Sequence, residues 1–230
     1  MEAGEIFGII GPNGAGKSTV INMISGVLKP SAGRVLFNGQ LISDLRPWDI
    51  AALGISRTFQ IVRLFHDSDV MQNVLLAQHL SRTPLFLAHL LRLPAARVEA
   101  RLLRERANEV LDQLHLTRYR SHRVQDLSSA EQRRLQVAMS LATGARLVLL
   151  DEPTAGLDRS EVAAFQNLIS GLARSTGRTF ILIEHNVGLV MSTCDRIMVL
   201  NFGHKIAEGV PDEIRRNPEV VRAYLGRVKA

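Results

Sequence analysis

A glycine-rich segment near the start of the chain restricts the possible folds more than any other feature. It reads G-P-N-G-A-G-K-S over residues 11–18, between an apolar run, Ile6–Ile10, and a segment of helical character, Ser18–Leu28. Glycines let the backbone curl so that successive N–H groups point at phosphate oxygens. The positive end of the following helix adds to that field. A strand, a phosphate-binding loop and a helix are therefore expected in this order.

Two polar side chains of the segment have defined roles in such a motif. Lys17 would reach the β- and γ-phosphates of a nucleotide, and Ser18 would hold Mg²⁺ through its hydroxyl. The predicted nucleotide-binding residues are Gly11, Pro12, Asn13, Gly14, Ala15, Gly16, Lys17, Ser18 and Thr19. The alternative is a glycine-rich turn with a surface lysine, but the flanking strand and helix favour the phosphate site.

Three further apolar runs have the length of buried strands. They span residues 147–150, 179–183 and 197–200, and helical stretches at 160–173 and 187–191 lie between them. Strands that alternate with helices predict an α/β fold whose parallel sheet is covered on both faces. The pair Asn38-Gly39 also predicts a β-hairpin, because it supplies the positive φ angles of a type I′ turn.

A long helical stretch interrupts this alternation. Apolar residues recur in it at the spacing of one buried helix face; they are Leu103, Ala107, Val110, Leu111 and Leu114. Ser128 and Glu131 form an S-x-x-E capping box at the start of its last helix. We therefore expect a single domain, 1–230, with a helical subdomain at 70–142 inserted into a core made of 1–69 and 143–230.

Titratable side chains close two of the apolar runs. Asp151 and Glu152 follow the first run, and Glu184 and His185 follow the second. Ligands bind at the carboxyl ends of strands in open α/β sheets. Asp151 could therefore organise Mg²⁺ and its waters, and Glu152 could polarise an attacking water as a general base. His185 could contact the γ-phosphate or that water, whereas the role of Glu184 is open.

Composition excludes several other classes of protein. Hydrophobic residues make up 46% and charged residues 22% of the 230 residues, which rules out a disordered or fibrous chain. A single cysteine, Cys194, rules out an intrachain disulfide. The net charge of +6 favours anionic partners without identifying nucleic acid. No apolar run approaches the roughly 18 residues of a membrane span, and the acidic start differs from a signal peptide, so a cytoplasmic location is expected.

The order of the motifs resembles that of ABC transporter ATPase subunits. The segments that carry the resemblance are Gly11–Thr19, Leu127–Arg133, Leu147–Glu152, Ala155–Asp158 and His185. Further resemblance to the branched-chain amino-acid importer group lies in residues 151–157, 183–186, 203–209 with Pro211, 217–220 and 223–226. The resemblance implies a P-loop NTPase sheet with a RecA-like core, ATP and Mg²⁺ as cofactors, and catalytic roles for Lys17, Glu152 and His185. ATP hydrolysis would power the import of branched-chain amino acids or similar small solutes.

The resemblance also implies partners. A second ATPase subunit, identical or different, would pair head to tail, so that each ATP lies between one subunit's loop and the other's signature segment. That segment is Ser128, Ser129, Ala130 and Glu131. Asp158 would act across the dimer, and it could equally be a helix N-cap. Permease subunits would hold the chain at the inner face of the cell membrane, a solute-binding protein would act indirectly, and no nucleic acid is expected.

Gln60 matches a glutamine that, in the family, contacts Mg²⁺ and links to the membrane subunit. The resemblance therefore implies a metal site made of Ser18, Gln60 and Asp151. The alternative for Gln60 is an ordinary polar residue of a loop.

The sequence departs from the family pattern in two places. The signature normally reads Leu-Ser-Gly-Gly followed by Gln or Glu, whereas this chain has Ser129 and Ala130 in place of the glycines. The methyl group of Ala130 would stand where a phosphate approaches the backbone. We therefore expect hydrolysis that is slow or that depends on a partner with an intact signature. Members of the family also carry N-terminal β-strands ahead of the position of Met1, with an aromatic residue that stacks on adenine. We expect these strands to be missing here, through a misassigned or truncated start or a genuinely shortened form. We therefore expect weak adenine selectivity, reduced stability and a hairpin without sheet partners.

Two other functions stay open. The altered signature is compatible with a hydrolysis-impaired nucleotide-binding subunit of a heterodimeric ABC system. A soluble ABC-type ATPase that acts on nucleic acid or ribosomes would favour a duplicated cassette or a basic linker, and this sequence has neither. The transported substrate cannot be read from the chain, because selectivity would lie in the membrane subunits and the binding protein.

Overall fold

A six-stranded sheet forms the centre of the computed structural model, which describes residues 1–58, 64–80 and 94–225. Its strands are β1 (Ile6–Ile10), β4 (Ile55–Arg57), β5 (Leu147–Asp151), β6 (Thr179–Ile183), β7 (Arg196–Asn201) and β8 (His204–Gly209). Their order in the sheet is β4-β5-β6-β1-β7-β8, and every neighbouring pair is parallel except β7 and β8. The parallel core expected from the four apolar runs is therefore confirmed.

The antiparallel strand β8 was not predicted. It follows β7 through a tight turn in which Phe202 and Gly203 have φ angles of 47° and 80°. Two successive positive φ angles match the right-handed twist of a two-residue hairpin. The strand is half-exposed at the edge of the sheet, and exposed positions do not require apolar side chains. For this reason no apolar run marks His204–Gly209 in the sequence.

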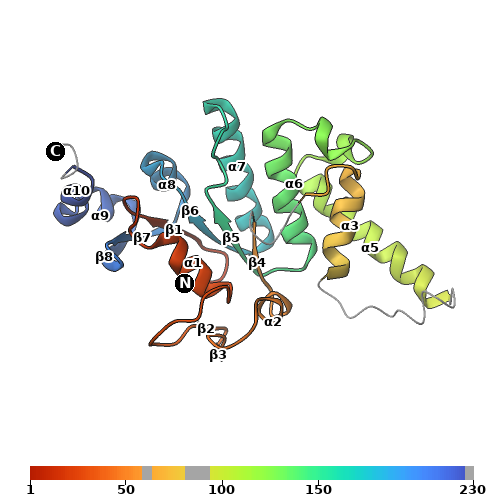
Figure 1. Cartoon of the computed structure of the whole chain (residues 1–230). Helices are drawn as coiled ribbons and strands as arrows, with labels where there is room; N and C mark the ends of the chain where they lie inside the picture. Colours follow the sequence, from red (N-terminus) through yellow and green to blue (C-terminus); the bar gives the residue numbers. More distant parts are fainter. Residues whose placement is uncertain (59–63, 81–93, 226–230) are drawn as a thin grey trace.

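Both faces of the sheet are covered, as the sequence predicted. Successive side chains of a strand point to opposite faces, and here each set packs into its own core. The larger core joins the sheet to α7 (Arg159–Thr176), α8 (Val187–Thr193), α9 (Pro211–Arg216) and α10 (Pro218–Leu225). The smaller core joins it to α1 (Lys17–Ile24) and α2 (Pro47–Ala52). Figure 1 shows α7 and α1 on the two sides of the strands.

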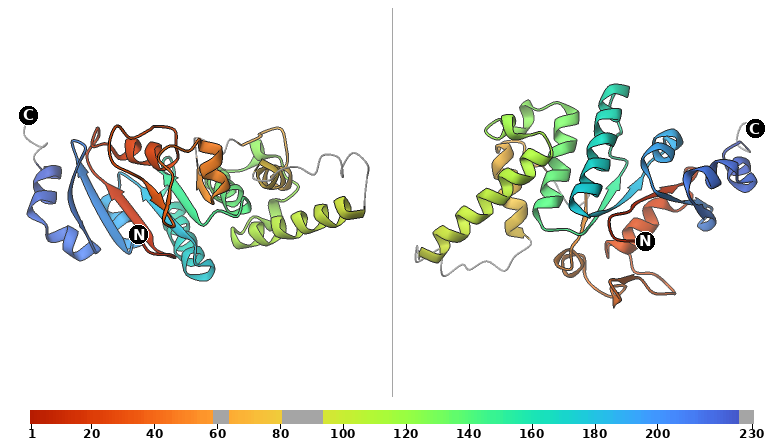
Figure 2. Two further views of the ribbon diagram at one scale, coloured as in Figure 1. Left: turned by 90° about the horizontal axis from the view of Figure 1, so that it is seen from below. Right: turned by 180° about the vertical axis from the view of Figure 1, so that it is seen from behind.

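Three helices gather beside β4 at one end of the sheet (Figures 1 and 2). They are α3 (Val70–Leu80), α5 (Pro94–Gln113) and α6 (Ser129–Ala142), with short 3-10 turns at Thr117–Tyr119 and Val124–Asp126. All five residues of the predicted apolar stripe in α5 and the turn that follows it are buried. This burial explains the helical spacing of the stripe. The division at 70 and 142 into core and subdomain stays a prediction.

The bounds of several predicted elements differ from the expectation, most of all the ends of two helices. Helix α1 ends at Ile24 rather than Leu28, because Gly26 turns the chain with a φ of 73° and packs so closely on Ile50 that a Cβ would lie 2.6 Å from its Cδ1. Helix α7 runs to Thr176 rather than 173, and Gly177 then ends it in the left-handed conformation.

The predicted hairpin is present as β2 (Leu36–Phe37) and β3 (Gln40–Leu41). Its turn residues Asn38 and Gly39 have φ angles of 49° and 79°, as the type I′ turn requires. The two strands form a sheet of their own, so within the described part of the chain the hairpin has no further strand beside it. None of the helices in that part is long and apolar enough to cross a membrane.

Candidate nucleotide-binding site

The glycine-rich loop joins the carboxyl end of β1 to the start of α1 (Figure 1). Gly14 and Gly16 have φ angles of 80° and 99°, and Gly16 caps α1 without a side-chain hydrogen bond. A Cβ on Gly11 would lie 2.2 Å from the carbonyl oxygen of Leu200 in β7. Glycine is therefore needed for the loop to pass this close to the sheet. The N–H groups at the start of α1 stay available for an anion.

Lys17 folds back over this loop. Its Nζ donates hydrogen bonds to the carbonyl oxygens of Gly11, at 2.8 Å, and Pro12, at 3.1 Å. Burial lowers the pKa of Lys17, although the carboxylates of Glu152 and Asp151 oppose that shift. The ammonium group thus lies in the loop with the two acidic groups close enough to act on it. Ser18 and Thr19, in contrast, are exposed.

Asp151 ends β5 and is held by a buried arginine. Nη2 of Arg57 donates to Oδ2 of Asp151 at 2.7 Å, and its Nη1 donates to Oδ1 of Asn22 at 2.6 Å. Arg57 is fully buried. Sequence reasoning missed this residue, because a basic residue in a three-residue strand has no local signature. Gln60, which was predicted to join the same metal site, lies outside the described residues.

Glu152 and His185 meet at the ends of adjacent strands. Nε2 of His185 lies 2.6 Å from Oε1 of Glu152, and both side chains are partly exposed. Glu152 has a φ of 50°, which is uncommon for a residue other than glycine, and its N–H donates to the carbonyl oxygen of Ile183. Backbone conformations of this kind concentrate at functional sites. The structure therefore brings the predicted general base and the predicted imidazole into direct contact.

Glu184, whose role the sequence left open, is buried and faces the loop after β5. Its Oε1 accepts hydrogen bonds from the backbone N–H of Thr154, at 3.0 Å, and from the Thr154 hydroxyl, at 2.7 Å. Both bonds fix the turn that follows Glu152. The contacts therefore give Glu184 a structural role.

The predicted signature residues begin helix α6. The Ser128 hydroxyl accepts from the N–H of Glu131 at 3.3 Å, and the Ser128 N–H donates to Oε2 of Glu131 at 2.8 Å, so the capping box is confirmed. Burial raises the pKa of Glu131, but hydrogen bonds with Tyr119 and Ser128 outweigh it and hold the pKa below its ordinary value. Ser128 and Ser129 are exposed, whereas Ala130 is buried. Helix α6 lies apart from α1 in the views of Figures 1 and 2.

Asp158 is the N-cap of α7. Its Oδ1 accepts from the N–H groups of Ser160, at 2.7 Å, and Glu161, at 2.9 Å. The hydrogen bonds from Glu161 and Ser160 hold the pKa of Asp158 below its ordinary value. The N-cap interpretation is thus confirmed, and the role across a dimer stays a prediction.

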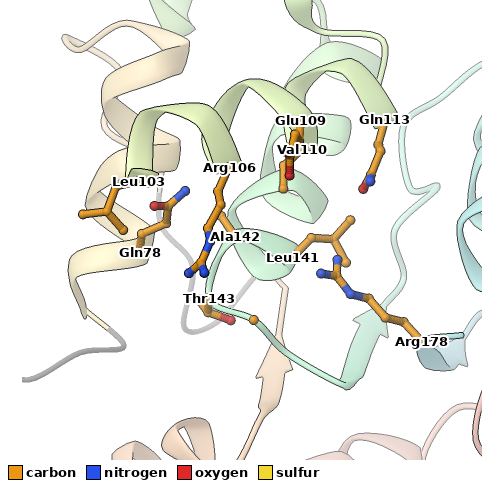
Figure 3. Close-up of a pocket in the computed structure, with 11 residues that line it drawn as sticks. Gln78, Leu103, Arg106, Glu109, Val110, Gln113, Leu141, Ala142, Thr143 and Arg178 are labelled. Carbon is orange, nitrogen blue, oxygen red and sulfur yellow. The ribbon is translucent and has the colours of Figure 1, made fainter. Parts of the chain in front are cut away.

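A cavity of about 310 Å³ lies elsewhere, at the junction of α3, α5 and α6 (Figure 3). Its polar lining includes Gln78, Arg106, Glu109, Gln113, Thr143 and Arg178. It contains none of the predicted site residues, so it is separate from the glycine-rich loop.

Side chains at the start of α1 and at the end of β5 fit a magnesium nucleotide. A hydroxyl at Ser18 and a carboxylate at Asp151 are oxygen donors of the kind that Mg²⁺ prefers, and Mg²⁺ in nucleotide sites takes its other ligands from phosphates and water. Within the described ranges, no three His, Cys, Asp or Glu side chains group around a possible metal. A magnesium ion bound together with phosphates does not require such a group.

Comparison with known proteins agrees with this geometry. Residues 1–155 match the family model described as ABC transporter, and residues 204–230 match the model described as branched-chain amino acid ATP-binding cassette transporter. The chain is 41% identical to the high-affinity branched-chain amino acid transport ATP-binding protein BraF of Pseudomonas aeruginosa, over 98% of this chain and 89% of BraF. It is 42% identical to the corresponding protein LivG of Escherichia coli, over 96% and 87%.

Solved structures give the same result. The ADP conformation of MJ1267, an ATP-binding cassette of an ABC transporter, superposes with a TM-score of 0.82 at 29% identity, over 97% of this chain and 89% of that one. A family match over more than half of the chain, relatives above 40% identity and the site geometry all agree with the expectation from the sequence. The chain therefore belongs to the ABC transporter family, as one of its ATP-binding and ATP-hydrolysing subunits.

Proposed function

We propose that this subunit powers the import of branched-chain amino acids or similar small solutes. The observation that carries the catalytic part is the 2.6 Å contact between Glu152 and His185 beside the glycine-rich loop. The substrate class rests on BraF and LivG, which are named as branched-chain amino acid transport ATP-binding proteins, and on the C-terminal match at residues 204–230.

Nucleotide binding would begin at the loop. The backbone N–H groups of residues 11–18 and the start of α1 would surround the phosphates of ATP. Lys17 would exchange the carbonyl oxygens of Gly11 and Pro12 for β- and γ-phosphate oxygens, which satisfy its charge better than neutral carbonyls. Ser18 and Asp151, together with Gln60, would hold Mg²⁺. Bound Mg²⁺ supplies positive charge to the phosphate oxygens.

Hydrolysis would depend on the contact at the strand ends. Glu152 would accept a proton from the attacking water as general base. His185 would orient the Glu152 carboxylate through its Nε2 and would contact the γ-phosphate or the water. The positive φ of Glu152 sets the direction in which its side chain leaves the backbone after β5.

We further propose that two such subunits enclose the ATP. The residues that would reach a partner's nucleotide, Ser128 and Ser129, are exposed at the start of α6 rather than near their own loop. A dimeric structure is known for MJ0796, a bacterial ABC transporter cassette that is 27% identical and superposes with a TM-score of 0.72. Asp158, exposed at the start of α7, would contact the partner. Permease subunits would hold the dimer at the inner face of the membrane, and a solute-binding protein would deliver the substrate.

The altered signature would limit the rate. Ser129 and Ala130 stand where the family has glycines, so the backbone would approach the partner's phosphate less closely. The variant with Ser129→Gly and Ala130→Gly should hydrolyse ATP faster than the parent. An unchanged rate would show that the signature is not the limiting element.

The function is tested by reconstituting the chain with its permease subunits in liposomes. Uptake of labelled leucine should require ATP and the solute-binding protein, and steady-state phosphate release should rise when leucine is present. Uptake that fails for leucine, isoleucine and valine, while ATP hydrolysis persists, would disprove the substrate class and leave the ATPase activity intact.

A further inference from the structure

A fully buried arginine joins three parts of the nucleotide site. Arg57 ends β4, and its guanidinium group spans from Asn22 in α1 to Asp151 at the end of β5. The two bonds use Nη1 and Nη2, whereas Nε is buried with no hydrogen-bond partner. Helix α1 begins with Lys17, and Gln60 follows Arg57 by three residues. The guanidinium group therefore lies where the loop helix, β4 and the aspartate strand meet.

A buried charge of this kind has a physical cost. Removing a guanidinium group from water is unfavourable unless its partners compensate, and an apolar residue is often tolerated in its place. The arrangement of planar donors in arginine suits two acceptors at fixed angles, which a lysine ammonium group cannot match. A role in orienting Asp151 would explain why a charge is kept here.

The ion pair with Arg57 uses only one of the two carboxylate oxygens of Asp151. The Arg57 guanidinium group donates to Oδ2 alone, and the Asp151 side chain is 14% exposed. The carboxylate is thus held through Oδ2, so that a metal or its water would bind through Oδ1. Replacing a partner that orients a metal ligand in this way typically costs about 10–100-fold in metal affinity.

We propose that Arg57 is a positioning residue for magnesium, which acts by orienting the Asp151 carboxylate and is itself oriented by Asn22. The proposal rests on the proposed function, since it takes Asp151 as a magnesium ligand. It assigns Arg57 no contact with the nucleotide. Its loss should therefore weaken metal binding and leave metal-free nucleotide binding as it was.

The test uses the full chain, a non-hydrolysable ATP analogue and Mn²⁺ as a paramagnetic substitute for Mg²⁺. Electron paramagnetic resonance counts free Mn²⁺, and fluorescence of a labelled analogue in EDTA measures nucleotide affinity without metal. The variant Arg57→Lys keeps the charge and loses the planar donor group, so its Mn²⁺ affinity should fall about tenfold. Asn22→Leu should cause a smaller loss in the same direction, because the bond to Asp151 remains.

Two controls separate positioning from folding. Arg146→Met removes an exposed arginine just before β5, away from Asp151, and should change neither affinity. Circular dichroism and thermal unfolding establish that each variant is folded. If Arg57→Lys does not fold, Asn22→Leu carries the test, since it leaves the ion pair in place.

The outcomes distinguish the two proposals. Folded Arg57→Lys with wild-type Mn²⁺ affinity would overturn the inference, as would an equal loss of metal-free nucleotide binding, which indicates a merely structural role. If Asp151→Asn binds Mn²⁺ as well as the wild type does, the magnesium assignment of the proposed function fails, and the inference fails with it.

Discussion

Nε2 of His185 lies 2.6 Å from Oε1 of Glu152, and the two residues follow the adjacent parallel strands β6 and β5. The contact depends on the strand register, in which Asp151 pairs with Ile183. Glu152 directly follows Asp151, and His185 lies two residues after Ile183, so both side chains leave the same edge of the sheet. The carboxylate of the proposed general base would thus be oriented by the imidazole before any water arrives, which would lower the entropy cost of catalysis.

Replacing Glu152 by Gln should abolish turnover without loss of fold. The amide cannot take a proton from water, so phosphate release should fall by roughly 10² to 10⁴. ATP-bound dimer should accumulate and appear as an earlier peak in size-exclusion chromatography with ATP. The matched control is Glu109→Gln, at an exposed carboxylate on α5. Turnover of Glu152→Gln at the parent rate would show that another group is the base.

Replacing Glu184 by Ala should reduce stability instead. The change leaves the N–H and hydroxyl groups of Thr154 without their acceptor in a buried place. The free energy of unfolding should fall by about 1–3 kcal/mol, the cost of unsatisfied buried polar groups. Urea denaturation measures this fall. A variant as stable as the parent would mean that water replaces the carboxylate.

Replacing Gly11 by Ala should disrupt the loop. The new Cβ would meet the carbonyl oxygen of Leu200 at 2.2 Å, and backbone cannot move aside cheaply. Both nucleotide affinity and melting temperature should fall. Gly33→Ala is the control, because Gly33 also has a positive φ, of 82°, but open space around it. Its cost should be limited to backbone strain of about 1–3 kcal/mol, with nucleotide affinity retained. Equal effects of the two substitutions would rule out the steric explanation.

Cys194 should make stability depend on pH in the alkaline range. Burial raises its pKa from 9.0 to about 12, so the folded thiol keeps a proton that the unfolded thiol releases. Its contribution is therefore fully present below pH 9.0 and is lost as the pH rises toward about 12. Urea denaturation of the parent and of Cys194→Ala across this range should show a steeper decline for the parent. Parallel declines would contradict the assignment.

The same burial predicts a protected thiol. The thiolate is the reactive form of cysteine, and a raised pKa keeps its population small. Iodoacetamide should therefore modify Cys194 only when urea unfolds the chain. Modification of the folded protein at the rate of an exposed thiol would show that α8 opens locally.

Local pattern was enough to predict much of the fold. The phosphate loop, the buried strands, the capping box at Ser128 and the N-cap at Asp158 each depend on residues within a few positions of one another. The spacing of apolar residues and the residues typical of helix ends reflect such short-range constraints directly. The ends of parallel strands share one sheet edge by topology, and for that reason Asp151, Glu152 and His185 could be placed together from sequence alone.

Tertiary structure decided what depends on distant contacts. Arg57 and Asp151 are 94 positions apart, and Thr154 and Glu184 are 30 apart, so no local pattern could pair them. The edge strand β8 forms only because β7 offers its free side, and its half-exposed residues lack an apolar run. The sequence by itself thus determined the loop and the acidic strand ends, through short-range chemistry. The packed sheet alone decided which buried partner orients each of those groups. A buried charge or hydrogen-bonding group is costly without a partner, and packing can bring that partner from a distant part of the chain.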